Sequence, residues 1–308
     1  MLQLTKVRSI GVLMERKKVD RTLAVRLLPR RAEDGNKGSF GRLLLLVGSK
    51  KYRGAPQLVT EAALRGGAGY VTLASEKSVT ESVLSVFPET LFSIIPPFSD
   101  LTDADIESIC ALDGKNTATV IGSGASSSLG LCRLTLALLK SGTSPLVIDA
   151  DAINVLSEDR SASIRAIATS SRPVILTPHP LEFSRISGFS TDEINNRREE
   201  LAEEFARSTG SIVLLKGKGT VITDGRTTFI NSSGGSALAK AGSGDTLAGL
   251  IGSLLASGGS ALDTAALAAY IHGAAGDKLA EEFSSFGVTP SDLPRMMARE
   301  IASLEEEQ

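Results

Sequence analysis

The stretch RLLLLVG, residues 42–48, is a run of apolar residues that ends in a glycine. A short, nearly continuous apolar run is typical of a β-strand covered on both faces, as in a parallel sheet. Five further runs share this character and predict strands: GYVTLAS (69–75), ATVIG (118–122), PLVID (145–149), PVILT (173–177) and IVLLK (212–216).

Helical patterns separate these runs and also follow the last of them. Alternation of strand and helix predicts a doubly wound sheet with right-handed crossovers. Residues 219–231 differ, because Asp224-Gly225 between two β-prone runs signals a hairpin. The expected fold class is α/β: a mostly parallel, doubly wound sheet flanked by helices, with a small hairpin near 219–231. Helices are expected at 55–65, 102–111, 128–140, 193–208, 244–257, 261–281 and 290–304.

Composition limits the kind of protein. The 308 residues carry a net charge of −2, which gives no electrostatic basis for nucleic-acid binding. No apolar stretch reaches the ~18 residues of a membrane span. Cys110 and Cys132 lack metal-ligand spacing, so we expect no disulfide and a reducing, cytoplasmic location. Residues 1–26 are a basic arm that we expect to be helical, and residues 27–308 are expected to form one domain.

Polar and small residues follow the predicted strands. In an open α/β sheet, ligands bind at the carboxyl ends of the strands, so these residues are expected to meet at one rim. A carboxylate there, such as Asp149, needs a cationic partner or a metal. The residues are Gly48, Gly122, Gly124, Asp149, Asp151, Thr177, His179, Lys216 and Gly217.

A Gly-Ser-Gly-Asp tetrad, residues 242–245, stands where a flexible segment turns into an apolar helix. The free N–H groups at a helix N-terminus carry partial positive charge, and Gly242 and Gly244 let an anion approach them. Asp245 lies in this field and could accept a proton from a substrate hydroxyl. The alternative is a loop entering a packed helix, with Asp245 as a first-turn cap.

Lys216 to Thr220 read KGKGT, directly after a predicted strand. Glycines at alternate positions let the backbone approach a nucleotide while the lysines supply charge, and an ordinary turn is the alternative. The sequence contains no G-x-x-x-x-G-K-[ST] phosphate loop, and GSGASSSLG (122–130) has only the first two glycines of a dinucleotide fingerprint.

The segment TPHPLE, residues 177–182, ends another predicted strand. Its prolines hold His179 among turn residues, which leaves open a ligand contact or a structural role. Glu182 either caps the next helix or reaches a hydrated Mg²⁺, which keeps its waters and binds few carboxylates. His272 lies among helical alanines and is expected to be structural.

Five motifs occur in one order: NKGSFGRLLLLVGSKKYRGAPQLVTEAALRGGAGYVTLAS, LVIDADAINVL, VILTPHPLEF, VLLKGKGT and NSSGGSALAKAGSGDTLAGLIGSLLA. From about Leu27 to about Leu279 the chain resembles the ADP- or ATP-dependent NAD(P)H-hydrate dehydratases of the ribokinase-like superfamily. The resemblance implies a repair enzyme that uses a nucleotide, with Mg²⁺, to return the (6S)-hydrate of NADH or NADPH to the reduced dinucleotide. The C6 hydroxyl is phosphorylated, and phosphate then leaves.

The resemblance also assigns residues by motif position. Asp245 would act as the base, the amides of Gly242 and Gly244 would hold the developing charge, and Glu182 would approach the metal through water. The hydrate would contact Ala55, Gly124, His179 and Asp245, and the nucleotide would contact Lys216, Gly217, Lys218, Gly219, Thr220 and Gly244. Pro56, Leu181 and IGSGASSS (121–128) depart from the family pattern, which leaves the fit of the substrate open.

The main alternative is a small-molecule kinase of the same fold, acting on a vitamin-precursor alcohol of the hydroxyethylthiazole or hydroxymethylpyrimidine type. A non-catalytic nucleotide-binding regulator is another. The chain looks more like the members that use ADP, so ADP rather than ATP is the expected nucleotide. The resemblance further implies a homotetramer, no nucleic-acid or membrane partner, and an NAD(P)H-hydrate epimerase on a separate chain as a metabolic companion.

Overall fold

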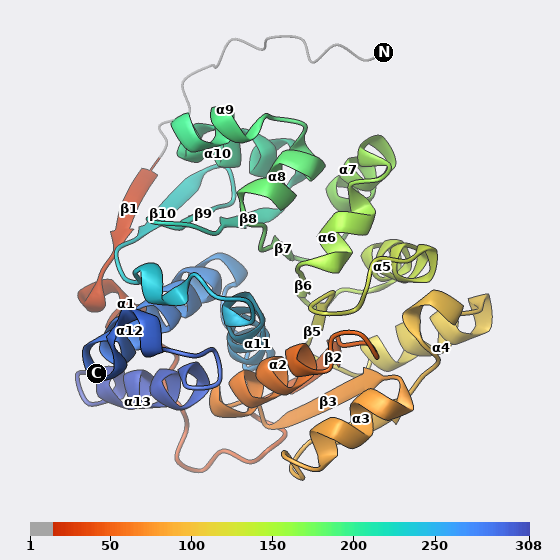
Figure 1. Ribbon diagram of the computed structural model, residues 1–308, viewed down its shortest axis with the longest axis horizontal. Coiled ribbons are helices and arrows are strands. Elements are labelled where there is room, and N and C mark those ends of the chain that lie inside the picture. The colour runs from red at the N-terminus through yellow and green to blue at the C-terminus, as the bar shows by residue number, and fades with distance from the viewer. Residues whose placement is uncertain (1–14) are drawn as a thin grey trace.

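The computed structural model describes residues 15–308. These residues form a ten-stranded sheet in the order β1-β10-β9-β8-β7-β6-β5-β2-β3-β4 (Figure 1). Strand β9 is antiparallel to β8 and β10, and every other neighbouring pair is parallel. The strands are β1 (Glu15–Val19), β2 (Arg42–Leu46), β3 (Tyr70–Ser75), β4 (Leu91–Ile94), β5 (Ala118–Ile121), β6 (Leu146–Ile148), β7 (Val174–Leu176), β8 (Ile212–Leu215), β9 (Val221–Thr223) and β10 (Thr227–Asn231).

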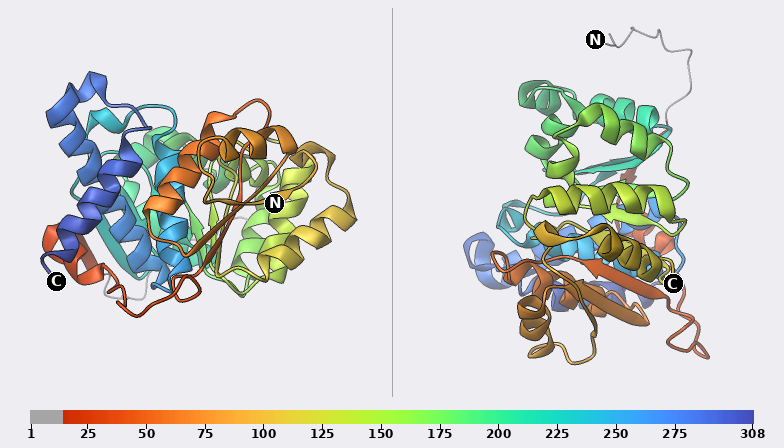
Figure 2. Two further views of the ribbon diagram at one scale, coloured as in Figure 1. Left: turned by 90° about the horizontal axis from the view of Figure 1, so that it is seen from below. Right: turned by 90° about the vertical axis from the view of Figure 1, so that its right-hand side faces the viewer.

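Helices cover both faces of this sheet (Figure 2). One face carries α1 (Arg21–Leu27), α2 (Gly54–Arg65), α3 (Lys77–Leu84), α11 (Ser243–Ala256), α12 (Ala261–Gly287) and α13 (Leu293–Glu305). The other carries α4 (Asp103–Asp113), α5 (Leu129–Ser141), α6 (Asp151–Leu156), α7 (Arg160–Ala168), α8 (Pro180–Ser187), α9 (Thr191–Asn196) and α10 (Arg198–Thr209). The predicted doubly wound architecture is therefore confirmed.

The burial of strand β2 on both faces explains its unbroken run of leucines. Leu43 and Leu45 belong to the core on the α11 side, whereas Leu44 and Leu46 belong to the core on the α5 side, and all four are fully buried. Burial of a leucine side chain stabilises the fold by about 1.5–3 kcal/mol. A strand that is buried on both faces needs apolar residues at every position, because successive side chains point to opposite faces.

The expected hairpin is present, with Asp224-Gly225 between β9 and β10. Gly225 has a φ of +82°, and Oδ1 of Asp224 accepts from the backbone N–H groups of Arg226 at 2.8 Å and Thr227 at 2.7 Å. The Asx turn and the left-handed glycine form the tight connection that this dipeptide predicts.

The expectation of a helical arm over residues 1–26 is wrong for residues 15–19. These residues form β1, which pairs in parallel with β10 at the edge of the sheet and has four exposed residues out of five. Charged side chains on an edge strand keep it from pairing with further strands. Helix α1 follows at 21–27, and residues 1–14 lie outside the described residues.

Two further elements differ from the sequence prediction. The segment 193–208 is not one helix, because the backbone leaves helical geometry at Arg197 (φ −137°, ψ 40°), between α9 and α10. Edge strand β4 was not expected, since its residues are only half-buried or exposed and give no continuous apolar run. Neither difference moves the rim of the sheet, where the polar residues gather.

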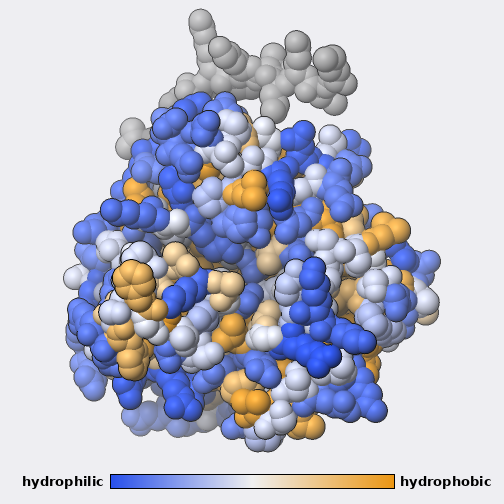
Figure 3. Space-filling view, in the orientation of Figure 1, coloured by the Kyte–Doolittle hydropathy of each residue, from blue (hydrophilic) through white to orange (hydrophobic). Residues whose placement is uncertain are grey.

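The surface seen in Figure 3 is mostly hydrophilic. A hydrophobic group lies over the end of α12, where Phe283 and Phe286 are 52% and 90% exposed. Within residues 15–308, none of the helices has the length and apolar character needed to cross a membrane.

Candidate active site

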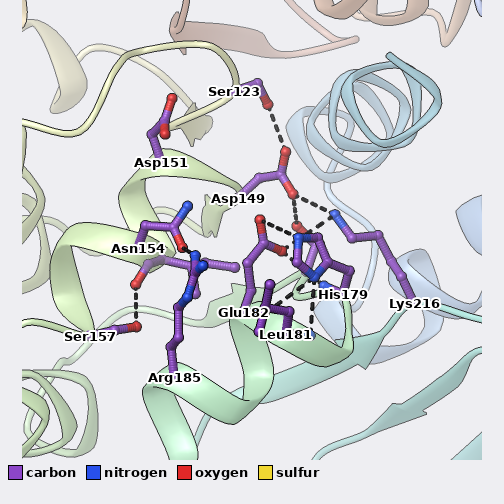
Figure 4. Close-up of polar contacts among 12 residues, drawn as sticks. Ser123, Asp149, Asp151, Asn154, Ser157, His179, Leu181, Glu182, Arg185 and Lys216 are labelled. Carbon is purple, nitrogen blue, oxygen red and sulfur yellow. Dashed lines mark hydrogen bonds and ion pairs between the residues drawn. The ribbon is translucent and has the colours of Figure 1, made fainter. Parts of the chain in front are cut away.

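Lys216, directly after β8, reaches into the polar rim towards Asp149 (Figure 4). Its Nζ lies 3.0 Å from Oδ1 of Asp149, which follows β6. Thr177 donates to the same oxygen at 2.7 Å, and Ser123 donates to Oδ2 at 2.8 Å. Burial lowers the pKa of Lys216, but the carboxylates of Asp149 and Glu182 outweigh it and raise the pKa overall. Lys216 is thus a fixed cation, and Asp149 has the partner that a buried carboxylate requires.

His179 and Glu182 form a capping box at the start of α8. Nδ1 of His179 accepts from the N–H groups of Leu181 at 3.1 Å and Glu182 at 3.2 Å, so the proton of the neutral ring lies on Nε2, 3.3 Å from Oε1 of Glu182. Oε2 of Glu182 accepts the backbone N–H of His179 at 2.9 Å. Burial, together with the charge of Lys216, lowers the pKa of His179 and keeps the ring neutral at pH 7. The capping role expected for Glu182 is confirmed, and the His179 side chain stays 46% exposed at the rim.

Helix α11 begins at the tetrad, with Gly242 as its N-cap. Gly242 has a φ of +104°, and a Cβ there would lie 2.7 Å from Cδ1 of Leu58, so both conformation and space require glycine. In the described part of the chain, the backbone N–H groups of Gly244 and Asp245 donate to no acceptor, and a Cβ at Gly244 would lie 3.3 Å from Nζ of Lys216. Free amides and an ammonium group therefore meet at one point, as an anion site requires.

Asp245 is half-buried in the first turn of α11. Its carboxylate forms no hydrogen bond or ion pair with residues 15–308, so it does not act as a cap. Burial raises the pKa of Asp245 to about 7, with the charge of Asp149 adding to the rise and that of Lys216 opposing it. A general base works best when its pKa is close to the working pH, so Asp245 is suited to accept a proton at neutral pH.

A cavity of about 580 Å³ opens beside this point. Its wall includes four of the five residues of the KGKGT loop, and in that loop Gly217 and Gly219 have φ values of +149° and +65°. Thr220 closes the loop by donating to the carbonyl of Gly217 at 2.9 Å. The volume lies in the range of small-molecule sites. The expected nucleotide residues that line it are Lys216, Gly217, Lys218, Thr220 and Gly244.

Ala55 and Gly124, the other expected substrate contacts, touch one another. A Cβ at Gly124 would lie 2.6 Å from Cβ of Ala55, so only glycine fits there. Ser123, the preceding residue, connects this pair to Asp149 and hence to Lys216. The structure therefore brings every site residue predicted from the sequence to the same edge of the sheet.

Two further residues support the site: Arg198, which the sequence analysis missed, and His272, whose expected structural role is confirmed. Arg198, the first residue of α10, donates from its NH2 group to the carbonyls of Leu215 at 3.1 Å and Lys216 at 3.0 Å, and so anchors the start of the KGKGT loop. His272 is buried in the cavity wall, and its Nε2 lies 3.0 Å from the carbonyl oxygen of Ser243 in α11. Arg198 belongs to a helix rich in charged residues and to no recognisable motif, so the residue types around it did not predict its role.

The acidic and histidine side chains described at the rim do not group as metal ligands do. Among residues 15–308, no group of three or more His, Cys, Asp or Glu side chains could hold a metal ion. The oxygens of Asp149 and Glu182 already accept bonds from protein groups. Direct coordination of Mg²⁺ by these carboxylates therefore does not fit this arrangement, and Lys216 supplies the positive charge at the rim.

The chain is similar to known NAD(P)H-hydrate dehydratases in sequence and in fold. The ADP/ATP-dependent NAD(P)H-hydrate dehydratase from Bacillus subtilis, co-crystallised with ATP and Mg²⁺, has a TM-score of 0.82 and 27% identity over 96% of this chain and 100% of that chain. The ADP-dependent (S)-NAD(P)H-hydrate dehydratase of Neisseria meningitidis is 35% identical over 228 residues, 73% of this chain and 72% of that protein. The bifunctional NAD(P)H-hydrate repair enzyme of Moorella thermoacetica is 37% identical over 290 residues, 91% of this chain and 53% of that protein. The chain thus spans about half the length of some curated relatives that it matches.

The fold and the site define a ribokinase-like protein, in which free helix amides and an ammonium group lie beside a carboxylate. The model of the NAD(P)H-hydrate dehydratase family matches residues 43–299. The chain belongs to that family, as its motifs predict.

Proposed function

We propose that this protein is an ADP-dependent (6S)-NAD(P)H-hydrate dehydratase that restores damaged NADH and NADPH. The observation that carries the proposal is Asp245, an unpaired carboxylate with a pKa of about 7 beside free helix amides and the ammonium of Lys216. A carboxylate in that place accepts a proton from an alcohol while the amides and the ammonium stabilise a transferring phosphoryl group.

In the first step the C6 hydroxyl of the hydrated ring attacks the terminal phosphorus of ADP. The O–H proton passes to Asp245, the new bond joins oxygen to phosphorus, and the bond to the bridging oxygen breaks to release AMP. The amides of Gly244 and Asp245 and the ammonium of Lys216 face the charge that develops on the phosphoryl oxygens. Gly242, whose amide the resemblance also assigns to this charge, sets the start of the helix.

In the second step the phosphate ester is eliminated. The bond between C6 and the ester oxygen breaks, and the lone pair of the ring nitrogen compensates the charge. C5 then loses a proton to the departing phosphate, and the C5–C6 double bond forms. The sum is hydrate plus ADP giving reduced dinucleotide, AMP and orthophosphate.

Magnesium enters this proposal with the nucleotide substrate, because Mg²⁺ in such sites binds phosphates and keeps several waters. Glu182 would meet the ion only through water, since its own oxygens are used in the capping box. Ala55, Gly124 and His179 are proposed contacts of the hydrate, and Lys216 to Thr220 are proposed contacts of the nucleotide. The homotetramer, the separate epimerase and the cytoplasmic location stay predictions.

The test is a repair assay with ADP and ATP in parallel. Protein, Mg²⁺, nucleotide and chemically hydrated NADH are mixed, and the absorbance of the reduced nicotinamide ring is followed. Recovery of that absorbance with release of AMP is the expected result. Absence of recovery with either nucleotide, together with phosphorylation of hydroxyethylthiazole, would favour the kinase alternative instead.

A further inference from the structure

His272 is a buried titratable side chain that the proposed phosphoryl transfer does not use. It lies in the middle of α12, is 7% exposed and lines the wall of the cavity of about 580 Å³. Its neighbours along the helix, in the sequence LAAYIHGAAGD (267–277), are mostly small or apolar. Burial of an imidazole in such surroundings costs free energy unless its N–H group finds an acceptor. The partner of the ring nitrogen therefore indicates what the side chain does.

That partner is the backbone carbonyl of Ser243, the first residue of α11. Nε2 of His272 lies 3.0 Å from the carbonyl oxygen. A carbonyl oxygen only accepts, so Nε2 carries the proton. Burial lowers the pKa of His272 to about 4, although the bond to Ser243 opposes the shift, and the ring is neutral at neutral pH. His272 is therefore a fixed donor toward the start of α11.

The first turn of α11 has no side-chain cap. A capping side chain takes up N–H groups of the first turn. At α11 the N–H groups of Gly244 and Asp245 stay free, as the proposed contact with phosphoryl oxygens requires. Among residues 15–308, the bond from His272 to Ser243 is the one hydrogen bond that joins residues 242–245 to another helix. It holds the turn through a carbonyl and leaves both N–H groups available.

Helix α12 is a firm base for this bond. A Cβ at Gly273 would lie 2.2 Å from Oγ of Ser233, and a Cβ at Gly276 would lie 2.6 Å from Cδ2 of Leu238, so the helix packs closely against the segment after β10. The rest of the contact between α11 and α12 belongs to one apolar core. Apolar contact is non-directional, whereas a hydrogen bond fixes the position of the turn.

We propose that His272 is a positioning residue for phosphoryl transfer: its bond to Ser243 holds the amides of Gly244 and Asp245 where the transferring group passes. The inference rests on the proposed function, because it assumes that these amides face a phosphoryl group. Stabilisation by fixed amides depends on their placement, and a displacement of about 1 Å can lower a rate on the order of 10²-fold. His272 acts through α11 and needs no contact with the reacting atoms.

The test compares His272→Leu, which loses the donor, with His272→Gln, which keeps an N–H group at the end of its side chain. The carbonyl of Ser243 also accepts from Oγ1 of Thr246 at 2.8 Å, so His272→Leu leaves no buried acceptor without a partner and should fold. We expect kcat to fall on the order of tenfold or more in His272→Leu and to stay within about threefold of wild type in His272→Gln. The KM for ADP should stay within about threefold in both variants, because the amides face charge that develops during the transfer.

Tyr270→Phe is the matched control. It removes a hydroxyl from another buried ring of the same helix, on the side that faces Arg21, and should leave kcat unchanged. An unchanged kcat in His272→Leu, an equal loss in His272→Gln, or a loss confined to the KM for ADP would overturn the inference.

Hydrogen exchange separates this inference from the proposed function, because it needs no reaction. Mass spectrometry of a peptide that spans the first turn of α11 should show faster exchange in His272→Leu than in the wild type, and no change in His272→Gln. If the wild type repairs no hydrate but the exchange differs in this way, the positioning of the turn stands and the proposed function fails. Equal exchange in all three proteins would refute the positioning role.

Discussion

At Asp245, burial and the neighbouring Asp149 act in the same direction, against the charge of Lys216. With a pKa of about 7, the carboxyl is half protonated at pH 7, and only the ionised form accepts a proton. We therefore expect kcat/KM for the hydrate to fall about tenfold per pH unit below pH 7 and to level off above it. Initial rates between about pH 5.5 and 9 measure this profile, and a rate that does not change with pH would contradict the role of the carboxylate.

Asp245→Asn tests the same group without a change of pH. The amide keeps the shape of the side chain but cannot accept the proton, so kcat should fall on the order of 10³-fold while the affinity for nucleotide stays within a few-fold. Asp192→Asn, the same substitution at an exposed position of α9, is the control and should leave kcat unchanged. Equal turnover of Asp245→Asn and wild type would remove Asp245 from the mechanism.

Gly242 is the residue whose backbone sets the start of α11. Gly242→Ala places a Cβ at a φ of +104° and within 2.7 Å of Leu58, so the free energy of unfolding should fall by about 1–3 kcal/mol. Gly54→Ala, at the first residue of α2 with open space around it, should change this energy by no more than about 0.5 kcal/mol. Denaturant unfolding followed by circular dichroism measures both, and equal stability of Gly242→Ala and wild type would show that the helix start tolerates a side chain.

Among the elements, α10 holds the KGKGT loop through a single side chain. Arg198→Met removes the two hydrogen bonds from the guanidinium to the carbonyls of Leu215 and Lys216, so the loop should lose its fixed position. We expect the KM for ADP to rise on the order of tenfold with kcat changed less than about threefold. Arg197→Met, which removes only an exposed pair with Glu200, should leave both constants unchanged. A loss confined to kcat would contradict a positioning role.

The elements also show how far the sequence predicts this fold. Six central strands were predicted because each is largely buried and nearly continuous in apolar residues. The edge strands β1 and β4 were not, because exposed positions accept charged or mixed residues such as ERKKV. The break at Arg197 carries neither glycine nor proline, so it depends on packing that a local pattern does not contain.

The site was predictable for a related reason. Asp149, His179 and Lys216 follow predicted parallel strands, and parallel strands bring their carboxyl ends to one edge. The pairing of Lys216 with Asp149 could not be read from the sequence, since the two residues are 67 positions apart. The role of Arg198 could not be predicted either, because its acceptors are backbone carbonyls, which every residue type has.

At the scale of the whole molecule, two cavities lie along the same edge of the sheet, on opposite sides of the Lys216 cluster. One is the cavity of about 580 Å³ beside Gly217, and the other, of about 330 Å³, is lined by Lys50 and Lys51. Because the two cavities lie at different strands, neither blocks the opening of the other. Asp245, at the start of α11, lies between them.

This arrangement has a kinetic consequence. Under the proposed function, ADP and the hydrate would be held at the same time, so the phosphoryl group would pass directly between them without a covalent adduct on the protein. Double-reciprocal plots against ADP at several fixed hydrate concentrations should therefore intersect, as sequential kinetics requires. A family of parallel lines would instead indicate a ping-pong scheme, in which AMP departs before the damaged dinucleotide arrives.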